Sequence, residues 1–448
     1  MKIVVYVLLI IYTFTILKNI IALIYLNSWM KKEKKEERKI KSKESLYLII
    51  PMLNEQKIAK TTYLNFKSIA DEIENVNVLF VTTSKEKKVE GKKSTYEILD
   101  ELVKDEEKMV VCNYNNTHGV MAHQINYAMR VIKEHRKHNQ KILIGIYNAD
   151  SKINPNVIKY VLNKEEKRDE KDYTCYQQYS WYRIENGKSR IGIIPSASLW
   201  QTRWSLTFEM FRIKQQELIL KLYKKKIIPK FIYVIFEKMN YVIGHGFFMD
   251  MDLLEKIGGF PEETINEDAF LGYIIGNYNI KIEAVPYLEK ADFAPKTSIY
   301  VKQQATWVNG PIYAFSYYSL YKEKHNLKFG EKIRALFLAF KLFLHFIYWI
   351  ISPYLLLFLM PILMYIYYSV SGLIIVGILI LLELPFTHYL VRLVTLSNIN
   401  KDDRKELAMP SIFCIPFFLI HSFGAVRNIF LQIAGKNTKE NKYKTERE

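Results

Sequence analysis

The uneven distribution of apolar residues limits what this chain can fold into. Residues 3–26 are apolar except for Lys18, Asn19 and a few hydroxyl groups, and the chain becomes largely apolar again after residue 332. A helix of about 20 apolar residues is long enough to span a bilayer. The basic charge follows the first apolar run instead of preceding it, which disfavours a cleaved signal peptide. We therefore expect membrane helices at both ends of the chain, around a soluble domain.

The basic excess fits a membrane surface better than a nucleic acid. Lys and Arg number 64 and Asp and Glu 46, which gives a formal net charge of +18. No nucleic-acid reader motif accompanies this charge, so no nucleic acid is expected as a partner. Segment 31–43 holds eight basic and three acidic residues. The positive-inside rule places this segment in the cytoplasm and the N-terminus outside. The three cysteines show neither metal-ligand nor disulfide spacing, which fits a reducing compartment.

Short apolar strands alternate with helices after the basic segment. Strands are predicted at 46–50, 76–81, 109–112 and 142–146, and helices at 57–72, 94–104, 120–134 and from Pro155 onward. This alternation predicts a mostly parallel, doubly wound sheet. Ligands of such sheets bind at the carboxyl ends of the strands. The residues at those ends are Pro51, Asn54 and Glu55, then Thr82 and Thr83, then Asn148 and Asp150.

The next two segments differ in character. Residues 199–243 mix aromatic residues with lysines at helical spacing. This pattern fits amphipathic helices in the membrane interface, with helices packed on the sheet as the alternative. In segment 244–310, glycines flank an acidic pair, Glu267-Asp268, at the predicted start of a helix. Acidic residues favour a helix N-terminus through the helix dipole, and they can also serve chemistry there.

The apolar C-terminal region leaves the number of membrane crossings open. Residues 333–368 contain two prolines and form one kinked span or two shorter ones; 369–372 form a turn, and 373–391 another span. Segment 391–405 is basic and expected in the cytoplasm. A single crossing at 409–433 would put the basic tail outside. We therefore expect a re-entrant or in-plane segment there, or an extra crossing near Pro353.

Six motifs occur in an order that points to one family. They are LIIPMLNE at 48–55, GVMAHQINYA at 119–128, YNADSKINP at 147–155, YQQYS at 176–180, GGFPEETINEDAFLGY at 258–273 and QQATWVNG at 303–310. In order and spacing they resemble the membrane-embedded family 2 glycosyltransferases, which include cellulose, chitin and hyaluronan synthases and ceramide glucosyltransferase. The resemblance implies a glycosyltransferase A-type, Rossmann-like cytosolic domain with N- and C-terminal transmembrane helices.

The resemblance also implies an activity. A hexosyl- or N-acetylhexosaminyltransferase would move a sugar from a nucleotide-diphosphate sugar, such as a UDP-sugar, to a lipid-linked or polysaccharide acceptor, with inversion. Mg²⁺ or Mn²⁺ would neutralise the diphosphate. The location implied is the inner cell membrane, with several crossings and a cytoplasmic catalytic domain. Cell-envelope polysaccharide biosynthesis would be its setting.

Site residues follow by matching motif positions. Asp268 resembles the general base, with Glu267 orienting it or binding the acceptor, and Asp150 resembles the metal-binding carboxylate. The donor-binding residues implied are Pro51, Asn54, Glu55, Thr82, Thr83, Asn126 and Asn148. The acceptor-binding residues implied are Gln178, His245, Gly246, Gln303 and Trp307.

Three positions depart from the family pattern. Asn148 stands for the first aspartate of the D-x-D element, Thr82 and Thr83 stand near a base-binding aspartate, and Thr306 replaces the arginine of Q-x-x-R-W. Loss of that arginine weakens the case for a processive synthase. A single-addition glycolipid glycosyltransferase and a non-catalytic membrane scaffold of the same fold are the alternatives.

The predicted organisation has seven segments. They are a transmembrane helix at 1–27, a basic cytosolic linker at 28–44, a nucleotide-sugar half at 45–198, interfacial helices at 199–243, an acceptor and catalytic half at 244–325, transmembrane or interfacial helices at 332–434 and a basic tail at 435–448.

Overall fold

The computed structural model describes residues 2–35, 44–87, 91–137, 140–168, 173–239 and 241–434. Residues 36–43 of the predicted linker, and the predicted tail, lie outside them. The chain forms two compact units. The sheet unit comprises Lys34–Tyr179 and Asn240–Glu289, and the helical unit comprises Met1–Glu33, Ser180–Met239 and Lys290–Glu448. The predicted acceptor half, 244–325, contributes residues to both units.

The sheet unit is built on seven strands in the order β3-β2-β1-β4-β7-β5-β8. Their bounds are Ser45–Pro51 (β1), Val76–Thr83 (β2), Met109–Tyr114 (β3), Ile142–Ile146 (β4), Thr174–Gln177 (β5), Phe247–Asp250 (β7) and Lys281–Ala284 (β8). The first four strands are parallel, as predicted. Strand β7 runs antiparallel to β4 and β5, which the sequence did not indicate.

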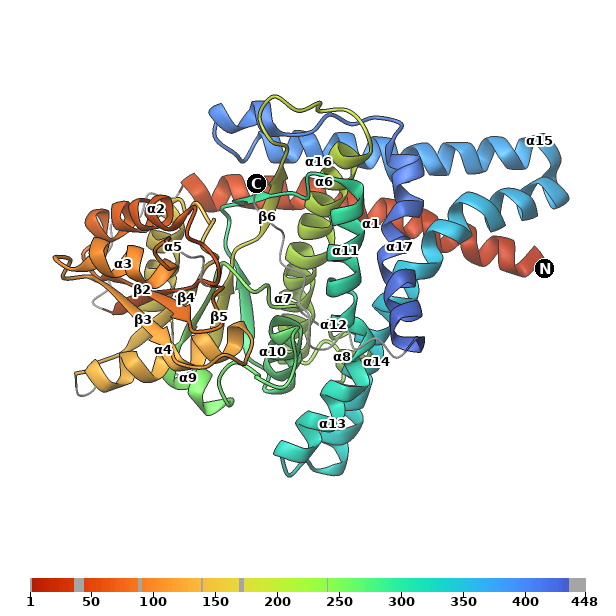
Figure 1. Cartoon of the computed structure of the whole chain (residues 1–448). Helices are drawn as coiled ribbons and strands as arrows, with labels where there is room; N and C mark the ends of the chain where they lie inside the picture. Colours follow the sequence, from red (N-terminus) through yellow and green to blue (C-terminus); the bar gives the residue numbers. More distant parts are fainter. Residues whose placement is uncertain are drawn as a thin grey trace. The chain divides into compact units, whose positions relative to one another are not determined.

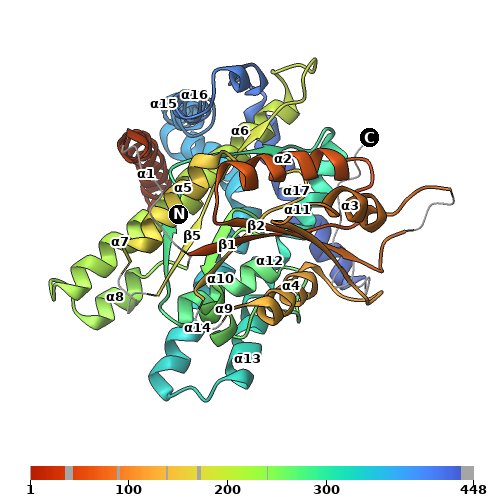
Figure 2. The ribbon, with the colours of Figure 1, turned by 90° about the vertical axis from the view of Figure 1, so that its left-hand side faces the viewer.

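Helices cover both faces of this sheet, which confirms the doubly wound prediction. Helices α2 (Ala59–Glu72), α3 (Thr95–Val103) and α5 (Pro155–Glu166) lie on one face, and α4 (Met121–His135) and α9 (Met251–Lys256) on the other (Figures 1 and 2). Side chains of α2 and α5 share one apolar core with β1 and β2. Asn154 accepts a hydrogen bond from the Asn156 amide at 3.0 Å and caps α5, with Pro155 in the first turn as predicted.

The helical unit contains most of the apolar sequence. Its longer elements are α1 (Lys2–Lys35), α6 (Ile193–Arg203), the π-helix η1 (Trp204–Met210), α7 (Phe211–Lys224), α11 (Thr297–Trp307), α13 (Ala314–Lys324), α14 (Phe329–Tyr354), α15 (Met360–Leu381), α16 (Thr387–Leu396) and α17 (Cys414–Ile433). Shorter ones are α8 (Lys230–Phe236), α12 (Asn309–Ile312), η2 (Leu355–Leu359), η3 (Leu382–Phe386), η4 (Asp402–Glu406), and the β-ribbon of β6 (Ser180–Arg183) and β9 (Glu289–Asp292).

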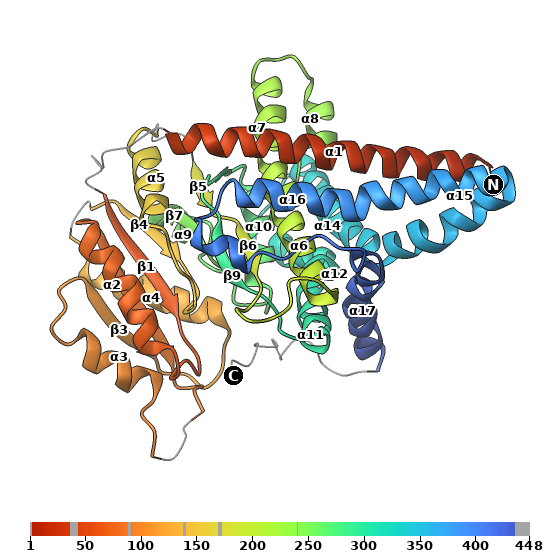
Figure 3. The same cartoon turned by 90° about the horizontal axis from the view of Figure 1, so that it is seen from above.

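Within the residues that the structure describes, three helical stretches are long and apolar enough to cross a membrane: Lys2–Lys35, Phe329–Leu396 and Cys414–Ile433. The second stretch holds 68 residues and reverses at Ser369, whose φ of 50° and ψ of −139° are not helical. The predicted turn at 369–372 is therefore confirmed, and the two arms form a hairpin beside α1 (Figures 1 and 3). The predicted α/β class with apolar helices on both sides is confirmed.

Helix α17 differs from the other two stretches. It runs across the direction of α1 and α15 instead of along it (Figures 1 and 3), and it packs on α11, α14 and α6. The re-entrant or in-plane placement predicted for 409–433 stays a prediction.

Gly145 allows the central strand β4 to pack. A Cβ at this position would lie 2.8 Å from Leu48 Cδ2 and 2.8 Å from Phe248 Cε1. We expect Gly145→Ala to destabilise the protein by about 1–3 kcal/mol through overpacking. A lowered Tm in detergent would measure this. Gly330→Ala is the matched control, because no atom lies within 4 Å of its added Cβ. Equal Tm values for both variants would contradict the packing argument.

Candidate functional site

The carboxyl ends of β1, β2 and β4 meet at one edge of the sheet. The parallel register pairs Pro51 with Val81 and Ile49 with Ile146. The loops that follow these strands therefore leave the sheet side by side. This edge carries the predicted donor-binding residues of all three strand ends, as the alternating pattern indicated.

Two buried polar side chains form hydrogen bonds with the backbone at these strand ends. The sequence analysis did not identify either of them. Gln124 of α4 donates through Nε2 to the carbonyls of Met52, at 3.1 Å, and Val81, at 2.7 Å. Thr62 of α2 donates through its hydroxyl to the Ala149 carbonyl at 2.7 Å. The available signal was a polar residue inside the apolar face of each helix. These bonds fix the backbone around the strand ends.

Several predicted donor-binding side chains have partners within the protein. Asn54 has a left-handed backbone with φ of 54°, and its Oδ1 accepts from the Lys87 amide at 2.9 Å. Thr82 is fully buried and its hydroxyl donates to Asn113 Oδ1 at 2.9 Å. Thr83 donates to the Asn116 carbonyl at 3.1 Å.

Pro51 ends β1, and the buried Glu55 receives support from α3, because its amide donates to Thr95 Oγ1 at 3.1 Å. Together with Asn54, these residues form a short loop directly after a buried strand. Such a loop presents main-chain groups as well as side chains. The donor-binding role of these side chains stays a prediction.

Asn148 and Asp150 follow β4 directly. Both are half-buried, and the Ser151 amide closes a turn on the Asn148 carbonyl at 3.1 Å. Among the described residues, no group of three or more His, Cys, Asp and Glu side chains could enclose a metal ion. A cation held by one carboxylate and by substrate phosphates needs no such cage. One carboxylate and one amide oxygen fit that mode of binding.

Asn126 was predicted to bind the donor, and in the structure its side-chain amide forms hydrogen bonds with the loop that contains Phe260 and Glu262. Its Nδ2 donates to the Phe260 carbonyl and to Glu262 Oε1, both at 2.8 Å, and its Oδ1 accepts from the Phe260 amide at 2.9 Å. A Cβ on Gly259 would lie 2.8 Å from Asn126 Oδ1. Asn126 therefore holds the glycine-led loop that leads to the acidic pair.

The acidic pair begins helix α10 (Glu267–Asn277), as predicted. Glu267 is fully buried, whereas Asp268 is half-buried. A Cβ on Gly244 would lie 3.5 Å from Asp268 Oδ2 and 3.3 Å from Met121 Cε. The backbone at Gly244 thus runs directly beside the Asp268 carboxylate. Of the two carboxylates, only that of Asp268 belongs to a partly exposed residue.

His245 pairs with a carboxylate that the sequence did not reveal. Its Nδ1 lies 2.6 Å from Oε2 of the buried Glu289. Next to it, Gly246 has a φ of 63°, and a Cβ there would lie 2.9 Å from Gln178 Cβ. This glycine is required both by the backbone and by the close approach.

Gln178 is 1% exposed, and its Oε1 accepts from the Tyr147 hydroxyl at 2.6 Å. Burial chiefly, and also the charge of Glu289, raise the pKa of Tyr147 well above its usual value, so Tyr147 remains a hydrogen-bond donor. Gln178 therefore supports the site from within the core. Its assignment to acceptor binding remains a prediction.

Gln303 and Trp307 lie on α11 of the helical unit, and both are half-buried. Thr306, which stands in the family's arginine position, is 8% exposed and donates to the Lys302 carbonyl at 3.3 Å. Thr306 is thus a buried helix residue that carries no charge.

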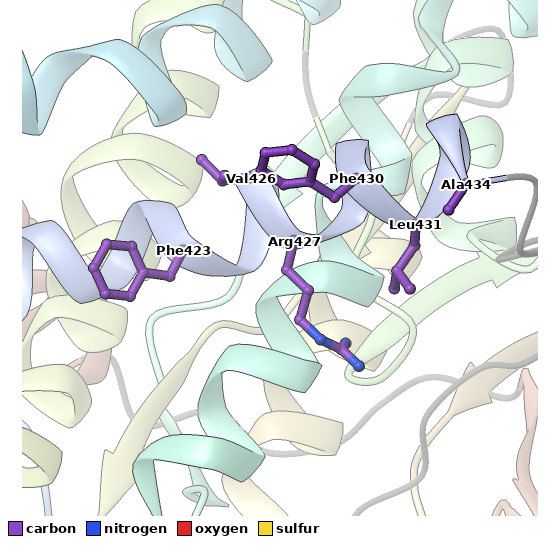
Figure 4. Close-up of a pocket in the computed structure, with 6 residues that line it drawn as sticks. All are labelled: Phe423, Val426, Arg427, Phe430, Leu431 and Ala434. Carbon is purple, nitrogen blue, oxygen red and sulfur yellow. The ribbon is translucent and has the colours of Figure 1, made fainter.

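A hollow of about 470 Å³ lies along α17 (Figure 4). Its lining is apolar apart from one guanidinium group and consists of Phe423, Val426, Arg427, Phe430, Leu431 and Ala434. It contains none of the predicted site residues, so it is distinct from the strand-end site.

Part of the chain, including two of the six motifs, matches a known protein family. Residues 225–382 match the family described as Glycosyl transferase family group 2. The resemblance to family 2 glycosyltransferases is confirmed. The match includes the GHG segment, the acidic pair and the QQATW segment, and it names the family group without one of its branches. No curated protein matches the chain.

The solved structures to which this chain is similar are distant from it in sequence. The mannosyltransferase PcManGT from Pyrobaculum calidifontis, in complex with GDP-Man and Mn²⁺, is 14% identical, with a TM-score of 0.42 over 95% of this chain and 99% of that one. TarS residues 1–349 from S. aureus, in complex with UDP-GlcNAc, are 10% identical, with a TM-score of 0.38 over 88% of this chain and 93% of that one.

The contacts of Asn126 separate its predicted donor-binding role from a positioning role. We expect Asn126→Ala to lower the turnover rate, because the loop before the acidic pair loses three hydrogen bonds, while the affinity for a sugar nucleotide stays unchanged. Steady-state kinetics and calorimetric titration of the sugar nucleotide would measure both. Glu262→Gln, which keeps both bonds to Phe260, is the control. A variant that mainly loses sugar-nucleotide affinity would contradict the positioning role.

Proposed function

We propose that this protein is a membrane glycosyltransferase that moves a sugar from a nucleotide-diphosphate sugar to a hydroxyl group of a lipid-linked or polysaccharide acceptor. The acceptor oxygen attacks the anomeric carbon, the bond from that carbon to the diphosphate oxygen breaks, and the nucleoside diphosphate leaves. The acceptor proton passes to a carboxylate. A single displacement of this kind inverts the anomeric configuration.

The observation that carries this proposal is the environment of Asp268. An acceptor hydroxyl is a weak nucleophile at neutral pH, and a carboxylate within hydrogen-bond reach can take its proton. Asp268 lies in the segment that matches family group 2, and it is the accessible member of the acidic pair. Gly244, whose backbone runs beside it, places no side chain of its own against the carboxylate. Glu267, which is fully buried, would orient Asp268.

The donor end is assigned to the strand-end site. Asp150, with the amide oxygen of Asn148, would hold Mg²⁺ or Mn²⁺. When bound, such a cation neutralises charge on the diphosphate leaving group. The loop after β1 and the Gln124-supported backbone would contact the nucleotide. A UDP-sugar is the donor we favour, and hexosyl and N-acetylhexosaminyl donors are both consistent with these residues.

The same proposal gives a topology. Helix α1 crosses with its N-terminus outside, and the hairpin of α14 to α16 crosses outward and returns. Helix α17 lies in the plane of the interface, so the basic tail stays on the cytoplasmic side. The catalytic residues are then cytoplasmic, at the inner face of the cell membrane, where sugar nucleotides are made.

The environment of Thr306 supports addition of a single sugar. The family's arginine would add a charge for the diphosphate, and a buried threonine supplies none. Product length in an assay with excess donor decides this point: one added residue supports it, and a polymer ladder contradicts it.

The general-base assignment predicts the effect of removing one charge. We expect Asp268→Asn to lower transfer about 100- to 10,000-fold, because the amide cannot accept the proton. Donor affinity should stay the same. Release of nucleoside diphosphate by purified membranes measures the first quantity, and calorimetry the second. Glu263→Gln, at an exposed carboxylate nearby, is the control. Full turnover by Asp268→Asn would rule out Asp268 as the general base. If the wild-type protein transferred no sugar from any donor, a non-catalytic scaffold would be favoured.

The cation assignment predicts a different effect. We expect Mn²⁺ to strengthen sugar-nucleotide binding by the wild type, and Asp150→Asn to abolish that gain, since the only carboxylate of the pair is lost. Calorimetric titrations with and without Mn²⁺ measure the gain. Asp105→Asn, at an exposed position of the same unit, should behave as the wild type. An unchanged Mn²⁺ gain in Asp150→Asn would place the cation elsewhere.

A further inference from the structure

A second group of charged residues lies in the helical unit, among the membrane helices. Phe208, in the π-helix η1, is its centre. Lys18 Nζ of α1 lies 5.9 Å from the ring centroid of Phe208, and Arg212 Cζ of α7 lies 4.0 Å from it. The ring of His345, on α14, lies 4.8 Å from the same ring. π-helical turns are rare and occur often at functional sites.

The orientation of α1 turns Lys18 toward the protein. Three residues of α1 at spacings of seven and four contact η1 and α7 in sequence. Lys18 meets Phe208, the Tyr25 ring lies 6.0 Å from that of Phe211, and Trp29 lies 4.1 Å from Lys214 Nζ. Residues at these spacings share one face of a helix. The Lys18 ammonium group is therefore directed at η1 and α7.

His345 adds a hydrogen-bond donor without a charge. Its Nε2 lies 2.8 Å from Arg212 Nη2. A guanidinium group can only donate, so the imidazole nitrogen accepts, and the ring proton is on Nδ1. Arg212 also donates to the Met239 carbonyl at 2.6 Å. Lys238 precedes Met239 in the chain, and the positive charges of Arg212, Arg203 and Lys238 act on Lys18, as does the negative charge of Glu383.

Positive charge exceeds negative charge around this cluster. The acidic groups nearby accept hydrogen bonds within the protein: Glu383 from Arg203, Glu237 from Arg334, and Glu209 from the Trp204 indole. The charge of Glu383 also acts on Lys18, so one carboxylate faces several cations. In the part of the chain that the structure describes, no carboxylate pairs with Lys18 or Lys238. Burial, and then the charge of Arg212, lower the pKa of Lys238. Charges inside a membrane protein are costly without compensation, and they mark ligand sites.

We propose that Lys18, Arg212 and Lys238 bind the phosphate group of a membrane lipid, with Phe208 and His345 lining the same site. Lys18 lies inside the apolar run of a candidate span, so the ligand must bring its charge into the membrane on an apolar chain. Phosphate offers the negative charge and acceptor oxygens that two ammonium groups and a guanidinium group require. Basic pockets between membrane helices on the cytoplasmic side bind such head groups.

Two sources carry this chemistry: a bulk anionic phospholipid and a lipid phosphate monoester that serves as a carrier. Native mass spectrometry of the full chain in neutral detergent can distinguish them. The probes are phosphatidylcholine, phosphatidylglycerol, an isoprenyl phosphate and inorganic phosphate. We expect retention of the two anionic lipids over phosphatidylcholine and inorganic phosphate. Tighter retention of the monoester identifies a carrier lipid, and equal retention of the two identifies a bulk phospholipid.

Substitutions test the residues. We expect Lys18→Gln and Lys238→Gln each to weaken binding of the anionic lipids about fivefold, as about 1 kcal/mol per basic residue implies. Lys18→Arg and Lys238→Arg should retain it. Lys221→Gln, at an exposed lysine of α7, is the matched control. Anionic lipid binding that is no better than that of phosphatidylcholine, or that survives in the double Gln variant, would overturn the proposal. Because the readout is binding and not transfer, either result leaves the proposed activity untouched.

Discussion

The two hydrogen bonds of the Gln124 side chain hold the strand-end site in shape. They join the carbonyls of Met52 and Val81, which belong to the ends of neighbouring parallel strands. A buried amide that lost these acceptors would cost about 1–3 kcal/mol, so the loops and α4 keep a fixed relation. Helix α4, which carries Gln124, also places Met121 beside Gly244 and Asn126 beside Phe260. One helix thus sets both the donor loops and the approach to the acidic pair.

Glycines complete this arrangement by bringing backbone close to side chains. At Gly244 the close neighbour is the Asp268 carboxylate, at Gly246 it is Gln178, and at Gly259 it is Asn126. At Gly246 and Gly259 a Cβ would come within 2.9 Å and 2.8 Å of those side chains, and both backbones have a positive φ, whereas at Gly244 the approach to the carboxylate would be an ordinary contact of 3.5 Å. The GHG and GG motifs are therefore geometric requirements of the loops around α10. The resemblance named these motifs, and the close approaches give the physical reason for them.

The sequence predicted the strands and strand ends because buried parallel strands leave a local signal, a short apolar run that ends in polar residues. The strand 142–146 and the cap at Asn154 depend only on neighbouring residues, and both agree with the structure. The antiparallel β7, the Gln124 bridge and the His245–Glu289 pair depend on residues far apart in the chain. No local pattern encodes such contacts. The predicted donor contact of Asn126 came from motif matching, whereas its observed partner, Phe260, lies 134 positions away.

In the apolar segments, too, the contacts of a residue could not be predicted from its neighbours in the sequence. Lys18 stood out in the sequence as a charge in an apolar run, which by itself is compatible with a lysine that reaches for the membrane surface. Its spacing to Tyr25 and Trp29 becomes informative only once η1 and α7 are known to lie along that face. The buried ion pair of Arg203 and Glu383 then becomes informative as well. This carboxylate is already paired with Arg203, and its charge acts on Lys18 as well. Among the described residues positive charge therefore stays in excess around Lys18, and an anion from outside the chain would balance it.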